Sequence, residues 1–229
     1  MITSGRPGEP ATESPARRDS RRRTALARRT RTRVALLAAA RAVFAEQGWA
    51  DTRMEDVARA AGVSPATAYN HFTGKHALIG AAYALAWQEG LDETPADVGA
   101  GPALPGARTR ALAVHLHRIS RVARRHRALT AAFACAVQEY TARVRRPPSP
   151  GDPDDPRLST PVSERIASLL DAGQRSGELG RQRDPADLAE QLTFLLFLRC
   201  FTHPEEDPDD TAAMLLGIAL GALPAEPDA

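Results

Sequence analysis

The chain has 229 residues, of which 43% are hydrophobic, enough for the core of one large or two small domains. Its two cysteines, Cys135 and Cys200, lie far apart and have no neighbours at metal-ligand spacing. We therefore expect no disulfide framework, no zinc site and no cofactor. No apolar run reaches the roughly 18 residues of a membrane span, and the Arg-rich N-terminus lacks the apolar segment of a signal peptide. This composition predicts a cytoplasmic protein without a membrane partner.

The formal net charge of +2 hides a gradient along the chain. Residues 1–33 hold ten arginines and three acids (+7), residues 34–146 carry +5, and residues 147–229 carry −10. The arginine block over residues 17–33 cannot collapse on itself and would release counterions from a nucleic acid. A disordered tail that merely improves solubility is the alternative explanation.

The N-terminal third is expected to contain a disordered arm and then short helices. Residues 1–25 hold almost no apolar side chains, so burial cannot offset the entropy cost of ordering them. From Arg33, apolar residues recur at helical spacing as far as Gly48, a C-terminal cap, which predicts a first helix of about 18 residues. Asp51-Thr52 supplies oxygens for the N-cap of a short second helix, which ends at Gly62.

A third short helix is expected over roughly residues 65–72. Ser64 caps it, and Pro65 occupies the first helical position, where its missing N–H costs nothing. A fourth helix is expected over 76–93, before a Pro- and Gly-rich break over 94–106. Later helices are expected as a pair within 107–146 and then, after a Pro-rich loop over 147–156, at about 161–176, 185–202 and 209–222.

Alternation of apolar and polar residues with period two never persists, so we predict an all-α fold. Three parts are expected. They are a disordered Arg-rich arm over 1–25, a helix-turn-helix DNA-binding domain over 26–75, and a helical ligand-binding and dimerisation domain over 76–229.

The spacing of the second and third helices is typical of a helix-turn-helix. Gly62 permits the tight turn between them, and Val63 is expected to fill a small core with Val57, Ala68 and Phe72. The outward face of the third helix then holds Ser64, Pro65, Ala66, Thr67, Tyr69, Asn70 and His71.

These segments resemble the DNA-binding domain of the TetR family over about residues 30–80. The resemblance rests on FAEQGWADT at 44–52, VARAAGVS at 57–64, TAYNHF at 67–72, and the Lys75 and Leu78 that follow. It implies that phosphate is held by Thr52 and Lys75, and that Thr67, Tyr69 and His71 lie near DNA. The chain departs from the family at Ala68, where a larger Leu or Ile is usual, and at Asn70, a position that varies within the family.

Hydroxyl groups suit phosphate oxygens, whereas sequence is read by groups that reach base edges. We therefore expect Ser64, Pro65, Ala66 and Asn70 to read bases, with Asn70 able to pair with adenine through two hydrogen bonds. Arginines of the arm could also enter an adjacent minor groove. The alternatives are ordinary structural roles: a solvated Lys75, a core-facing Tyr69 and an internally hydrogen-bonded His71.

Beyond residue 95 the resemblance is one of architecture alone. Polar or aromatic groups on apolar helix faces are candidates for a ligand cavity, although each could equally be a core residue. The candidates are Tyr83, Trp87, His115, Ile119, Phe133 and Gln138. A four-helix homodimer interface is expected from the apolar faces of the last two helices, with a monomeric core as the alternative. Its candidate residues are Leu188, Leu192, Leu195, Met214 and Ile218.

The sequence thus predicts a ligand-responsive transcriptional regulator, a repressor that binds a palindromic DNA operator as a homodimer and is released by a small-molecule inducer. An activator or a ligand-independent DNA-binding protein remains the alternative. A helical enzyme with a basic arm is disfavoured, because no nucleophile–base set, phosphate loop or metal-ligand motif is present. High Ala, Arg and Pro usage suggests a GC-rich bacterial genome.

Overall fold

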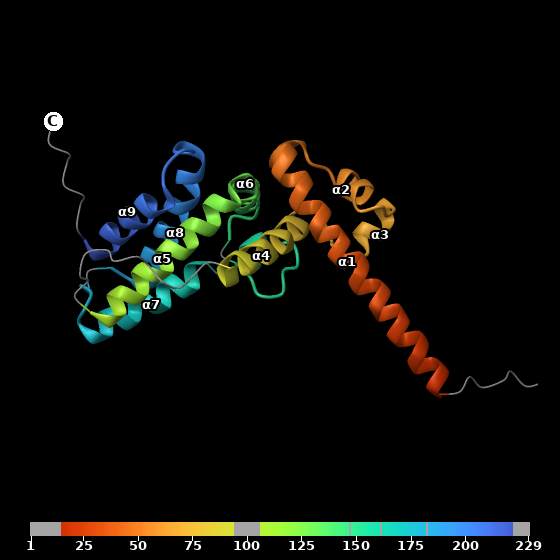
Figure 1. Cartoon of the computed structure of the whole chain (residues 1–229), viewed down its shortest axis with the longest axis horizontal. Helices are drawn as coiled ribbons and strands as arrows, with labels where there is room; N and C mark the ends of the chain where they lie inside the picture. Colours follow the sequence, from red (N-terminus) through yellow and green to blue (C-terminus); the bar gives the residue numbers. More distant parts are fainter. Residues whose placement is uncertain (1–14, 94–105, 147, 161, 182, 222–229) are drawn as a thin grey trace, which may run out of the picture.

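The computed structural model describes residues 15–93, 106–146, 148–160, 162–181 and 183–221. Within these ranges the chain is helical, and no strand is present in the part that is described. The all-α prediction is confirmed. The helices form an N-terminal unit around one long helix and a C-terminal bundle (Figure 1).

The N-terminal unit contains four helices, α1 (Pro15–Asp51), α2 (Met54–Ala60), α3 (Pro65–Tyr69) and α4 (Lys75–Glu93). The helices α2 and α3 lie beside the C-terminal half of α1, whose N-terminal half projects away from the rest of the chain (Figure 1). The long α4 packs on α1 and leads into the bundle.

The C-terminal bundle contains α5 (Ala107–Arg125), α6 (Arg127–Val144), a short 3-10 helix η1 (Pro156–Leu158), α7 (Val162–Ser176), α8 (Pro185–Thr202) and α9 (Pro208–Leu220). The helix α5 lies at its centre, in contact with α4, α7, α8 and α9. Prolines at the first positions of α8 and α9 follow Asp184 and Asp207, whose carboxylates accept backbone hydrogen bonds as N-caps. None of the described helices is both long and apolar enough to cross a membrane.

The predicted helix boundaries agree closely with the structure except at the N-terminus. The prediction of disorder is wrong for residues 15–25, which form the first turns of α1, while residues 1–14 lie outside the described residues. Helical dihedral angles are interrupted at Gly48, where φ is 75° and ψ is −173°. The predicted stop at Gly48 therefore corresponds to a real kink, after which the chain turns toward α2.

One continuous core joins the two units. On the N-terminal side, Leu36, Phe44 and Val57 are fully buried, and on the bundle side so are Leu116 and Leu192. The bundle is also tied by charge, because the Arg121 guanidinium donates two hydrogen bonds to the Asp209 carboxylate, at 3.0 and 2.9 Å. The N-terminal unit is therefore packed on the bundle rather than tethered to it.

Candidate nucleic-acid interface

The turn between α2 and α3 has the backbone geometry that a helix-turn-helix needs. Gly62 adopts φ +69°, a left-handed conformation that a side chain would strain. The next amide, of Val63, donates to the Ala58 carbonyl at 3.0 Å. Ser64 then caps α3, since its Oγ accepts from the Thr67 amide at 3.2 Å. The turn predicted from Gly62, Ser64 and Pro65 is confirmed.

The inner face of α3 is fixed by a small apolar core. Ala68 and Val57 are fully buried, Phe72 is nearly so, and Val63 packs against them while partly buried. Ala68 leaves room for close approach of α3 to α2, which a Leu would fill. This packing fixes the rotation of α3 and therefore which residues it presents outward.

The outward face of α3 holds the predicted DNA-contact residues. Ser64, Pro65, Ala66, Tyr69 and Asn70 are exposed, whereas Thr67 and His71 are partly buried. Tyr69 leaves 48% of its surface accessible, so the alternative of a core-facing ring is excluded.

The hydroxyls of Ser64 and Thr67 bond each other, with 2.8 Å between the oxygens. One of the two protons is therefore used internally, and at most one remains to donate to DNA.

A basic groove runs beside this face. It has a volume of about 730 Å³ and lies between the N-terminal half of α1 and the start of α3. Its α1 wall includes Arg21, Arg28 and Arg29, and its other wall includes Ser64 and Thr67. The Arg21–Arg29 stretch extends the exposed face of α3 with a row of positive charge.

Two contacts hold α1 against the end of α3. The Arg33 guanidinium lies 4.4 Å from the centre of the Phe72 ring and donates to the His71 carbonyl at 3.3 Å. Burial, followed by the nearby charges of Arg29 and Arg33, lowers the pKa of His71 below its usual value. The lowered pKa favours the uncharged form of the imidazole in the free protein.

Thr52 and Lys75, by contrast, have structural roles. Thr52 is 1% exposed, and its hydroxyl donates to the Gly48 carbonyl at 2.7 Å. This burial contradicts the phosphate contact predicted for its side chain.

The Lys75 ammonium donates to the carbonyls of Trp49 and Thr52, at 2.5 and 2.9 Å, and lies 3.9 Å from the centre of the Trp49 ring. Burial lowers the pKa of Lys75, against the opposing charges of Glu139 and Asp51. Lys75 thus bridges the start of α4 and the α1–α2 connection, and the phosphate contact predicted for it stays a prediction.

The same region is joined to the bundle through α6. The Trp49 indole Nε1 donates to Glu139 at 2.6 Å, and the His76 Nε2 lies 3.5 Å from the other Glu139 oxygen. The Trp49 and His76 rings are in contact, with 4.6 Å between their centres. A second link joins Thr73 to Asp154 at 2.6 Å. The position of the helix-turn-helix is thus coupled to α6 and to the loop before η1, a connection that no sequence signal indicated.

Of the six predicted ligand residues, His115 lines a cleft between α5 and α7. Tyr83 is fully buried and stacks on Phe133, with 4.2 Å between ring centres, and Trp87 completes this aromatic cluster. Ile119 is fully buried and Gln138 is exposed. The five do not line the cavity beside His115, and their binding role stays a prediction.

The predicted dimer residues divide into two groups. Leu188 and Leu192 are 4% and 0% exposed, so they belong to the core of the single chain, which contradicts their placement in an interface. Leu195, Met214 and Ile218 are only partly buried. The most exposed large apolar residues of α8 and α9 are Phe194, Leu198, Phe201 and Leu220.

Comparison with known proteins agrees with this geometry. Residues 36–82 match the family described as bacterial regulatory proteins, tetR family. This range covers the C-terminal part of α1, all of α2 and α3, and the start of α4. The comparison with curated proteins finds no match.

Solved structures share the whole fold. A TetR-family protein of Rhodococcus sp. is 23% identical with a TM-score of 0.58, over 82% of this chain and 98% of that one. Thermus thermophilus FadR, a TetR-family repressor in complex with lauroyl-CoA, is 20% identical with a TM-score of 0.57, over 86% and 98%. RolR, in complex with resorcinol, is 19% identical with a TM-score of 0.56, over 88% and 93%.

An exposed recognition helix, a basic groove and an all-helical second domain define a helix-turn-helix DNA-binding regulator. The family match assigns residues 36–82 to the tetR family of bacterial regulatory proteins, and the chain as a whole shares the fold of the solved structures.

Proposed function

We propose that the chain is a repressor that binds a palindromic operator as a homodimer and leaves it when a small molecule binds to the helical bundle. The observation that carries the proposal is the exposed face of α3, with Tyr69 and Asn70 beside a groove walled by Arg28 and Arg29. A recognition helix enters the major groove, and flanking arginines neutralise phosphates.

The roles along α3 follow from chemistry and exposure. Tyr69 and Thr67 suit phosphate contacts, and Ser64, Pro65, Ala66 and Asn70 are placed to meet base edges. The α1 arginines take over the phosphate contacts that the sequence assigned to Thr52 and Lys75. Because α1 is helical from Pro15, these charges lie along a rod rather than on a disordered arm.

Dimerisation is proposed to cover the apolar surface of α8 and α9. Phe194, Leu198 and Phe201 recur at spacings of four and three on α8, so they share one face, and each is at least 38% exposed. Aromatic and aliphatic residues of this kind form the cores of homodimer interfaces. Two copies would present two α3 helices to half-sites roughly 34–36 Å apart.

Ligand response is proposed because similar structures hold small molecules, lauroyl-CoA in Thermus thermophilus FadR and resorcinol in RolR. A ligand that favours one arrangement of the bundle shifts the population of that arrangement. The contacts of Trp49 and Thr73 with α6 and the loop before η1 provide a route by which such a shift would move the two α3 helices.

Selection of binding sites from randomised duplex DNA tests the proposal. We expect the full chain to enrich an inverted repeat, and the logarithm of affinity to fall linearly with the logarithm of salt concentration. The variant Arg28→Gln should reduce this slope by about 0.9 for each phosphate that is no longer neutralised.

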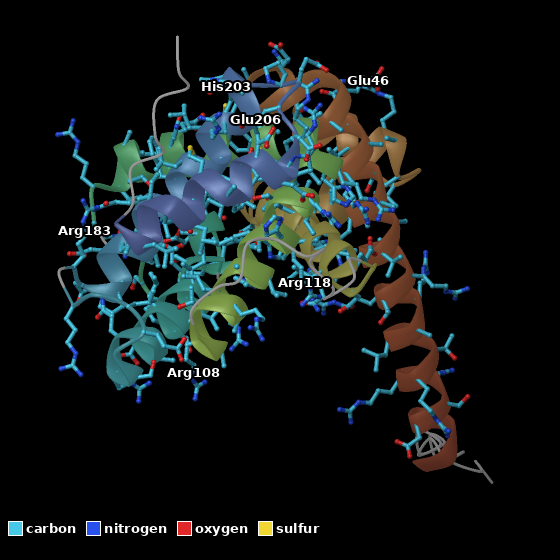
Figure 2. The ribbon with its side chains drawn as sticks, turned by 60° about the vertical axis from the view of Figure 1, so that its left-hand side comes forward. Glu46, Arg108, Arg118, Arg183, His203 and Glu206 are labelled. Carbon is cyan, nitrogen blue, oxygen red and sulfur yellow. The ribbon has the colours of Figure 1, made fainter. Side chains whose placement is uncertain are left out.

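Arg183→Gln is the matched control, because Arg183 lies on the opposite side of the molecule from α1 (Figure 2). Equal slopes for Arg28→Gln and wild type would remove α1 from the interface. Failure to enrich any sequence would refute the regulator itself. In transcription in vitro with the selected site over the promoter, a decrease identifies a repressor and an increase an activator.

A further inference from the structure

A second concave site lies on the bundle, between α5 and α7. Its volume is about 410 Å³, within the range of roughly 300–1,000 Å³ that is usual for small-molecule sites. Val114 and Leu169 contribute apolar wall, and Arg110, Arg118, His115 and Arg165 contribute nitrogen groups. Figure 2 shows Arg118 on α5, on the same helix as Arg108.

The ionisable residues that line this cleft are all basic within the described part of the chain. None of the described residues that line it is acidic. The side chains of Arg110 and Arg165 have no hydrogen bond or ion pair with another side chain in the described part of the chain. Three arginines that line one cleft without an acidic lining residue repel one another, and an anion would relieve that repulsion.

Two buried nitrogen atoms in the cleft also lack partners. The Arg118 guanidinium donates to the Leu91 carbonyl through Nη2, but its Nε is buried with no acceptor among the described residues. The Nε2 of His115 is likewise buried without a partner there. A buried polar group that has no partner costs free energy, so a ligand atom that reached either nitrogen would be stabilised there.

The state of His115 fits the same picture. Burial, followed by the charges of Arg165 and Arg118, lowers the pKa of His115 to about 4. The imidazole is therefore neutral at physiological pH and adds no further positive charge. A neutral imidazole offers one donor and one acceptor, which suits an oxygen of a bound molecule.

We propose that the α5–α7 cleft binds a small organic anion, a carboxylate or phosphate group carried on an apolar body, and that this anion is the regulator's ligand. The guanidinium groups hold the charged group, because arginine pairs with planar carboxylates and with phosphates through two hydrogen bonds. The Val114 and Leu169 side chains cover part of the apolar body. The proposal deepens the ligand response of the proposed function, and its regulatory part rests on that function.

Calorimetric titration of the full chain with decanoate, decyl phosphate and 1-decanol, each below its aggregation concentration, tests the site. We expect at least one of the two anions to bind at least tenfold more tightly than the alcohol. The better of the two anions identifies the charged group. Equal binding of all three, or binding of none, overturns the proposal.

Two variants on α7 locate the binding. Arg165→Gln should weaken binding of the better anion roughly tenfold, the loss expected for a hydrogen bond to a charged group. Arg175→Gln, on the same helix but paired with Asp171 outside the cleft, should change it less than twofold. Equal effects of the two variants would show that the anion binds elsewhere.

A third measurement separates this proposal from the proposed function. The better anion should weaken the binding of the wild-type protein to the selected operator. The same anion should weaken operator binding by Arg165→Gln less. Without anion, the variant and the wild type should bind the operator equally well. Anion binding without any effect on a functional DNA complex would overturn the regulatory part of this proposal. Absence of specific DNA binding by wild type would instead refute the proposed function and leave the anion site standing.

Discussion

Replacing Lys75 by Met distinguishes the structural role of this residue from a DNA-binding one. The substitution keeps the length of the side chain but removes the ammonium that donates to the Trp49 and Thr52 carbonyls and stacks over the Trp49 ring. An acceptor left without its donor costs about 1–3 kcal/mol, here near the lower end because the site is only partly buried. Removal of the cation–π interaction adds roughly 0.5–1 kcal/mol. We expect Lys75→Met to lower the free energy of unfolding by about 2–3 kcal/mol.

For a chain of this size that loss corresponds to a decrease in Tm of roughly 5–10 °C. Tryptophan fluorescence during thermal unfolding measures it, and operator affinity is measured well below the new Tm, where it should stay within about threefold of wild type. Arg59→Met is the control, because the Arg59 side chain is 77% exposed and pairs with Asp56 on the surface. It should change stability by less than about 0.5 kcal/mol. An unchanged Tm together with a large loss of DNA affinity in Lys75→Met would refute this reasoning and restore the phosphate contact.

Other substitutions test the remaining parts of the account. Tyr69→Phe should weaken binding to all DNA sequences by a similar amount, on the order of 1 kcal/mol, whereas Asn70→Ala should change the base preferred at one position of each half-site. Selection of binding sites with both variants checks this. Exchanged effects of the two substitutions would reverse the orientation of α3 on DNA. Phe194→Arg should give a folded monomer with weak operator binding, since Phe194 is 54% exposed in the single chain. An intact dimer in analytical sedimentation would place the interface elsewhere. His115 has a pKa of about 4 in the folded chain and about 6.5 in the unfolded chain, so the unfolded state binds the proton more tightly and stability falls as the pH falls from 6.5 to 4, by at most about 3 kcal/mol. His115→Gln should make this decrease in stability smaller, which urea unfolding at several pH values measures. Parallel pH profiles for variant and wild type would contradict the burial of this imidazole.

The helix boundaries were predictable because local signals determine them. Gly62, Ser64 and Pro65 define the turn and the start of α3 through backbone conformation and capping alone. The same kind of signal was present at Pro15, a proline at a first helical position followed by many Ala and Arg residues with high helix propensity. Low hydrophobicity outweighed it in the prediction of a disordered arm, which is why the helical wall of the groove was missed.

The roles of single side chains were less predictable, since they depend on partners that are distant in sequence. Lys75 meets carbonyls 26 and 23 residues earlier, and Trp49 meets Glu139, 90 residues later. Periodicity identified an apolar helix at Leu188 and Leu192 but could not tell a side that faces the chain's own core from one that faces a second copy. The cleft at His115 likewise depends on α7, which packs beside α5 only in the folded chain.

The central claim is that the exposed face of α3 lies in the major groove of an operator half-site. A DNA-cleaving iron chelate attached at Asn70→Cys, in a chain whose Cys135 and Cys200 are replaced by serine, tests it directly. We expect cleavage confined to two places on the selected operator, about one helical turn apart, and none from the same chelate attached at Arg183→Cys. Uniform cleavage from Asn70→Cys, or equal cleavage from Arg183→Cys, would contradict it.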